Sequence, residues 1–139
     1  MRKTVVILAA VAAWSGEGLA HHSQAMFDRT KIVHLVGELK SFTYQAPHAW
    51  ISIIGSPEGE GPDQQWDVET VAPNVLSRIG LTPETVQPGD KLTIGAYPLH
   101  DGRRGGMLLY VIKPDGTEVG WRTPEMRAEH ERRFEAGAP

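Results

Sequence analysis

The sequence predicts a small all-β domain, a five-stranded barrel with one short helix between its third and fourth strands. Short β-rich segments separated by glycine and proline turns predict the strands, and one stretch of helical periodicity interrupts them. The 139 residues suffice for one domain, and the 40% hydrophobic content suits a packed core. The sequence contains no cysteine, which excludes disulfides and thiolate metal sites.

Three strands are expected before the helix. The first spans residues 31–44, and Gly37 in its middle predicts a β-bulge or a sharp bend. A turn leads into the second strand, residues 50–54. The third strand spans residues 65–71 and alternates apolar with acidic side chains, which predicts one buried and one solvated face.

The spacing of apolar residues then becomes that of a helix over residues 73–80. Pro73 suits the first turn of a helix, and Gly80 suits its C-terminal cap. Residues 91–97 and 107–112 are expected as the fourth and fifth strands, with a glycine-rich loop between them. This order is that of the oligosaccharide/oligonucleotide-binding (OB) barrel. A small β-sandwich is the alternative, and the position of the helix favours the barrel.

The first twenty residues have the order of a secretory signal peptide. Arg2 and Lys3 give a positive start and residues 5–13 are apolar. Gly18 and Ala20 are small residues at the two positions that a signal peptidase recognises. A transmembrane anchor is the alternative, but the apolar run is shorter than the ~20 residues that span a bilayer. The expected organisation is a signal peptide (1–20), an N-terminal arm (21–30), an OB-like barrel (31–121) and a charged helical tail (122–139).

Cleavage after Ala20 would make His21 the new N-terminus. We therefore expect a periplasmic or secreted protein with no integral membrane span after processing. Removal of residues 1–20 leaves 12 basic and 16 acidic residues, a net charge of −4. This acidic excess argues against nucleic-acid binding, which favours a basic face. The expected partners are a metal ion or a small ligand, and another periplasmic protein.

Several different short motifs are distributed along nearly all of residues 20–117. Together they resemble an uncharacterised family of small secreted bacterial proteins that is classed as a domain of unknown function. The resemblance implies a mature start at Ala-His-His-Ser and a Pro-His-x-Trp motif, but no activity. The family usually has asparagine before Pro-His, where this chain has Ala46. The motifs include Ala20-His21-His22-Ser23, Pro47-His48-Ala49-Trp50, Trp66-Asp67-Val68-Glu69, Pro73 to Gly80, and Pro88-Gly89-Asp90.

His21 is the first candidate for a metal ligand. At a free N-terminus it offers the α-amine and ring Nδ1 in one chelate, and a third imidazole would complete a site that suits Cu(II). The local chemistry resembles the histidine brace of secreted copper proteins. His22 is a second candidate. Cleavage before Ala20 would make His22 the third residue of the mature chain, and the terminal amine, two backbone amides and its imidazole could then hold Cu(II) or Ni(II) in a square plane. An exposed terminus without a metal is the alternative.

Other candidates lie inside the domain. His48, in a turn fixed by Pro47, is the expected internal metal ligand, although it could simply hold the turn. Glu69 could be a ligand or could orient a histidine from outside the coordination shell, and a solvated strand face is the alternative. Trp50 and Trp66 could form a ligand-binding platform or could pack in the core.

Three further histidines and one basic pair rank lower. His34 fits the polar face of the first strand, His100 lies in a loop, and His130 lies in the charged tail. The pair Arg103-Arg104 is the one local basic feature and could hold an anion or only face solvent. It is not a phosphate loop, because no lysine and hydroxyl residue follow the glycines.

The predicted function is that of an exported metal-binding protein, a carrier or accessory factor that binds copper through its N-terminal histidines and His48. The alternative is a metal-free OB-type module. It would hold a small ligand or a partner protein near the two tryptophans and the loop 98–106. No serine lies in a nucleophile elbow, and no other catalytic set emerges, so an enzyme is the less favoured class.

Overall fold

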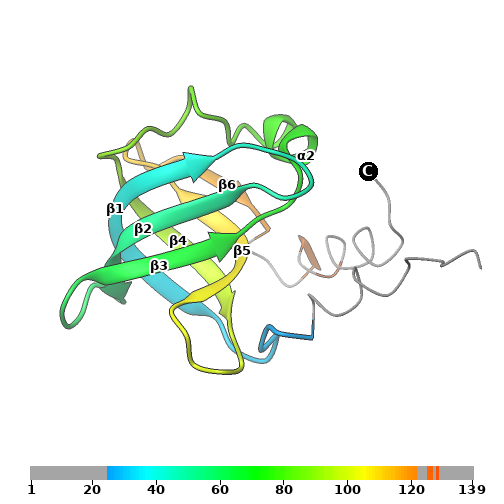
Figure 1. Cartoon of the computed structure of the whole chain (residues 1–139). Coiled ribbons are helices and arrows are strands. Elements are labelled where there is room, and N and C mark those ends of the chain that lie inside the picture. Colours follow the sequence, from blue (N-terminus) through cyan, green and yellow to red (C-terminus); the bar gives the residue numbers. More distant parts are fainter. Residues whose placement is uncertain (1–24, 122–124, 127, 129–139) are drawn as a thin grey trace, which may run out of the picture.

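The computed structural model describes residues 25–121, 125–126 and 128 (Figure 1). The predicted signal peptide, His21, His22 and His130 lie outside the described residues, as does nearly all of the predicted tail 122–139. No helix of the described part is long and apolar enough to cross a membrane. The elements are β1 (Val33–Thr43), β2 (Trp50–Pro57), β3 (Gln64–Glu69), α2 (Pro73–Arg78), β4 (Lys91–Pro98), β5 (Gly105–Ile112) and β6 (Glu118–Gly120).

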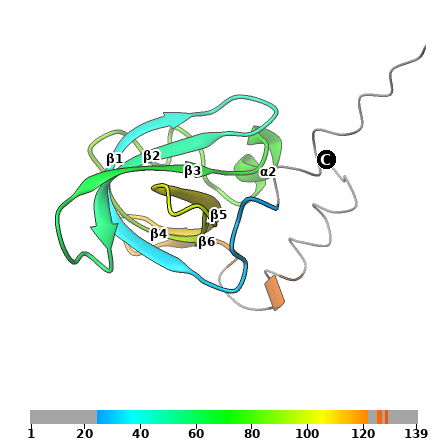
Figure 2. The same cartoon turned by 60° about the horizontal axis from the view of Figure 1, so that its bottom comes forward.

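Five strands close into a barrel. The hydrogen-bonded order is β3-β2-β1-β4-β5-β6, and β3 also pairs with β5 in parallel, which joins the two ends of the sheet. Strands β2 and β3 face β4 and β5 across the interior (Figure 2). The short helix α2 lies between β3 and β4, so the predicted barrel order is confirmed. The short strand β6 was not expected, and it extends the sheet beyond β5.

Gly37 serves a close approach between strands. It is the register partner of Gly55 on β2, and a Cβ on Gly37 would collide with the backbone of Ile54 and Gly55. The register shift in this pair lies between Leu39 and Ser41. The bulge that Gly37 suggested therefore falls later in β1, and the glycine itself allows β1 and β2 to pack backbone to backbone.

Alternation along the strands fills the barrel. Alternate side chains of the strands point inward, and α2 adds Leu76. The fully buried residues include Leu35, Leu39, Ile51, Ile53, Val68, Leu76, Leu81, Ile94 and Val111. Gly80 caps the C-terminal end of α2, as predicted. It has a φ of 78°, and Leu81 N–H donates to the Leu76 carbonyl at 3.0 Å.

The described part of the N-terminal arm is docked. Phe27 forms an isolated β-bridge with Leu99 and is 6% exposed. Asp28 N–H donates to the Pro98 carbonyl at 2.8 Å, and His100 N–H donates to the Met26 carbonyl at 2.9 Å. The Phe27 side chain is buried in this contact, while that of Met26 stays 44% exposed and only its backbone takes part.

Replacing Gly37 by alanine should destabilise the barrel by about 1–3 kcal/mol or more, because the new methyl group would overpack the contact with Gly55. Urea unfolding followed by circular dichroism measures this. Ser41→Ala, at an exposed position on the same strand, is the control and should stay within about 0.5 kcal/mol of the parent. Equal unfolding midpoints for Gly37→Ala and the parent would contradict the close approach.

Candidate functional site

His48 and Glu69 form the centre of the candidate site. Glu69 lies at the end of β3, and His48 lies in the turn between β1 and β2. Backbone hydrogen bonds from Ala49 to Val71 and from Thr70 to Ala49 hold this turn against the end of β3. The Nδ1 atom of His48 lies 2.5 Å from Oε1 of Glu69. A carboxylate here accepts from Nδ1–H, which leaves the lone pair of the imidazole on Nε2, the arrangement typical of a metal-binding histidine.

The two candidate tryptophans lie on opposite faces of the sheet. Trp50 is the register partner of Glu69 and is 43% exposed on the outer face of β2. Trp66 pairs with the buried Ile53 and packs against the core. One platform cannot contain both indoles, so Trp50 alone remains on the outer surface near His48.

A groove of about 260 Å³ opens beside Trp50. The docked arm lines one wall, the outer faces of β2 and β3 line another, and the loop between β4 and β5 lines the third. Its residues are Met26, Phe27, Leu99, Trp50, Asp67, Glu69 and Arg103 to Gly106. The second and third strands and the loop between the fourth and fifth are also where OB barrels hold ligands.

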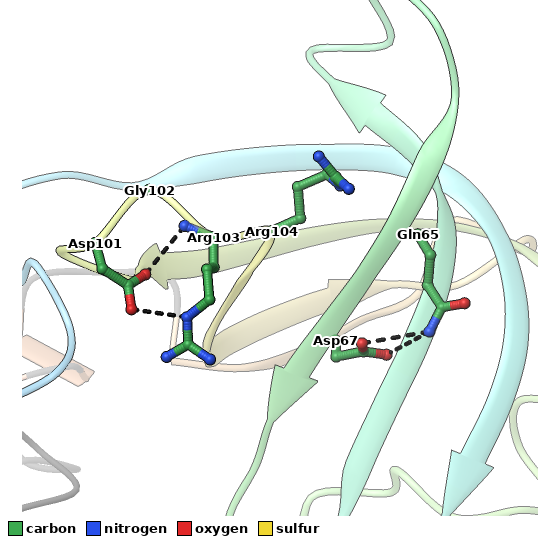
Figure 3. A pocket seen from close by; sticks show the side chains of 6 residues that line it. All are labelled: Gln65, Asp67, Asp101, Gly102, Arg103 and Arg104. Carbon is green, nitrogen blue, oxygen red and sulfur yellow. Dashed lines mark hydrogen bonds and ion pairs between the residues drawn. The ribbon is translucent and has the colours of Figure 1, made fainter.

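A second, more polar hollow of about 530 Å³ adjoins the first and shares Asp67, Arg103 and Arg104 with it (Figure 3). The carboxylate of Asp67 accepts from Ser52 Oγ at 2.5 Å and from Gln65 Nε2 at 3.0 Å. Sequence reasoning assigned Asp67 only to a solvated strand face. Its place opposite an arginine loop follows from the β3–β5 pairing, which no local pattern encodes.

The arginines of the loop differ in their partners. Arg103 is bound to Asp101 through Nε at 2.7 Å, and its backbone N–H donates to the same carboxylate at 3.0 Å. These contacts also lower the pKa of Asp101, the backbone N–H of Arg103 being the largest cause. The Arg104 side chain has no hydrogen-bond or ion-pair partner within the described ranges, and it points away from Arg103 (Figure 3).

Asp28 anchors the arm beside this groove. Its Oδ1 accepts from the hydroxyl of Thr30 at 2.5 Å and from Thr30 N–H at 3.0 Å, and Lys31 Nζ lies 3.0 Å from Oδ2. The Thr30 hydroxyl, together with Lys31, lowers the pKa of Asp28 from 3.8 to about 2. This network turns the chain from the arm into β1.

The structure brings together three of the predicted site residues, His48, Glu69 and Trp50. In the part of the chain that it describes, no three histidine, aspartate or glutamate side chains cluster as a metal site. His34 is placed elsewhere, with Nδ1 2.5 Å from the hydroxyl of Tyr110, and His100 is exposed in the loop after β4.

These elements define a closed OB-like barrel with a groove on the face of its second and third strands. The family of unknown function DUF6152 matches residues 8–110, so the chain belongs to that family. This agrees with the resemblance seen in the sequence motifs.

No curated protein matches the chain. Two crystal structures of the mitochondrial single-stranded DNA binding protein Rim1 from S. cerevisiae are similar at 15% identity, with TM-scores of 0.46 and 0.43. Each match covers 60% of this chain and 92% of the Rim1 chain.

The low pKa of Asp28 makes the arm sensitive to acid. The contribution of this carboxylate to stability should be complete above its unfolded pKa of 3.8 and should fade as the pH falls through about 2. Asp28→Asn should therefore be less stable than the parent at pH 6, and the difference should shrink toward pH 2. Urea unfolding of both proteins between pH 2 and 6 tests this, and a difference independent of pH would contradict it.

Proposed function

We propose that this is an exported periplasmic protein that binds Cu(II) at its mature N-terminus and His48, as a carrier or accessory factor. The observation that carries the proposal is the docking of the arm beside the His48–Glu69 pair. Phe27 and Asp28 fix the arm to Pro98 and Leu99, and Met26 lines the same groove as Glu69.

The length of chain available supports a meeting of His21 and His48. Five residue steps separate His21 from Met26 in the sequence. An extended chain spans about 3.3–3.6 Å per residue, so this segment can reach roughly 17 Å. Met26 lines the same groove as Glu69, the hydrogen-bond partner of His48, so a terminus at His21 would extend from the wall of the groove that contains this pair.

The donor set suits copper. The α-amine and Nδ1 of His21 would give one chelate, and Nε2 of His48 would supply the third nitrogen. Three nitrogens in a T shape match the tetragonal preference of Cu(II), which also heads the affinity order of divalent ions. Glu69 would hold the ring of His48 in place and increase its basicity. His22 is the alternative ligand if processing leaves Ala20 in place.

The first test is copper binding by the processed chain. Isothermal titration calorimetry should show one Cu(II) bound at pH 7 and weaker binding at lower pH, because the amine and imidazoles must lose their protons. Acetylating the N-terminus, His21→Ala and His48→Ala should each weaken binding by at least about tenfold, the loss of one nitrogen ligand.

His100→Ala is the matched control, because His100 lies on the neighbouring loop and its backbone rather than its side chain bonds the arm. It should leave the copper affinity unchanged. Unchanged affinity after acetylation or in His48→Ala would disprove the site.

Glu69→Gln tests the supporting role of the carboxylate. Glutamine keeps the shape but lowers the basicity that a carboxylate gives to the imidazole, so copper affinity should fall by roughly 10–100-fold. Asp67→Asn is the control, since Asp67 is the next outward residue on β3 but bonds Ser52 and Gln65 instead. Equal losses in both variants would show a general charge effect rather than orientation of His48.

A further inference from the structure

The exposed Trp50 is the first of three features that point to a second ligand. It lies on β2, which is flanked by β1 and β3, and its register partners are Thr43 and Glu69. The indole is thus held by a paired strand and yet is 43% exposed. An electron-rich aromatic face in such a position favours the C–H face of a sugar ring, whose hydrogens are weakly positive.

The second feature is a preformed set of planar polar groups beside the indole. Asp67 accepts from Ser52 and Gln65 and lies on the same outer face of β3 as Glu69. Carboxylate, amide and guanidinium groups pair well with vicinal hydroxyls, because each presents two polar atoms in one plane. The two adjoining hollows share Asp67, which suits a ligand longer than one ring.

The third feature is the charge of the groove. Arg104 is the guanidinium without a partner among the described residues, and guanidinium binds carboxylate in a bidentate geometry. The two hollows are lined by the guanidiniums of Arg103 and Arg104 and by the carboxylates of Asp67, Glu69 and Asp101. Arg103 is already paired with Asp101. A groove with more acidic than basic groups repels a polyphosphate chain, whereas one carboxylate on a polyhydroxylated ligand can be accommodated.

We propose that this groove, between β3 and the loop 99–104, binds a carboxylate-bearing oligosaccharide. The indole of Trp50 stacks on one sugar ring, Asp67 and Gln65 bond ring hydroxyls, and Arg104 binds the uronate carboxylate. The site uses neither His21 nor His48, so it stands independently of the copper proposal.

The probes are aldotriouronic acid, a trisaccharide with a single uronate carboxylate, and its methyl ester. The chain is expressed with its leader, purified as the cell processes it, and titrated by calorimetry with EDTA present to exclude metal bridging. Aldotriouronic acid should bind, and Trp50→Ala should weaken that binding at least tenfold. Arg104→Gln should weaken binding of aldotriouronic acid but not of its methyl ester, which lacks the carboxylate charge. Circular dichroism checks that each variant is folded.

Arg78→Gln, an exposed arginine of α2 outside the groove, is the matched control and should bind like the parent. The absence of aldotriouronic acid binding at millimolar concentration, or full affinity in folded Trp50→Ala, would overturn the proposal. A twelve-nucleotide oligothymidylate that binds more tightly than the trisaccharide, and whose binding is lost in Arg104→Gln, would also overturn the proposal, because it would assign the groove to nucleic acid. Loss of copper binding with retained binding of aldotriouronic acid would contradict only the copper site.

Discussion

The parallel pairing of β3 with β5 is the contact on which the candidate site depends. It covers only Asp67 to Glu69 against Gly105 to Met107. Gly105 is required there, because a Cβ at this position would lie 2.9 Å from the Asp67 carbonyl oxygen. This short seam closes the barrel and sets the loop that ends at Arg104 directly beside the outer face of β3. Without it, the carboxylates of β3 and the arginines would belong to separate surfaces.

The same loop also receives the N-terminal arm. Leu99 bridges to Phe27 at one end of the loop, and Arg104 accepts from Asp67 N–H through its carbonyl at the other. Arm, loop and β3 therefore meet at one mouth of the barrel. Segments distant in sequence become neighbours because β4 and β5 lead the chain back to the seam, so the groove is a consequence of topology rather than of any local motif.

Local patterns predicted much of the fold, and the strand glycines mark where they failed. Alternation gave the two faces of β3, and Pro73 with Gly80 gave the ends of the helical segment. The sequence placed Gly55 and Gly105 in loops, because glycine disfavours strands. Both lie within strands, where they allow backbones to approach closely. The pairing of His48 with Glu69 was predictable, because a carboxylate commonly orients a metal-binding histidine. The placement of Trp50 and Trp66 on opposite faces was not, because it depends on the register between β2 and β3.

The two outward carboxylates of β3 share one face, and their different partners distinguish the two proposed sites. Glu69 and Asp67 are successive outward residues, yet the first bonds His48 and the second bonds Ser52 and Gln65. One strand thus assigns one carboxylate to the metal side of the mouth and one to the groove. The two sites are still close enough to interact, because Glu69 and Arg104 line the same hollow. A cation held at His48 would attract an anionic ligand in the groove, and by linkage that ligand would strengthen metal binding by the same factor.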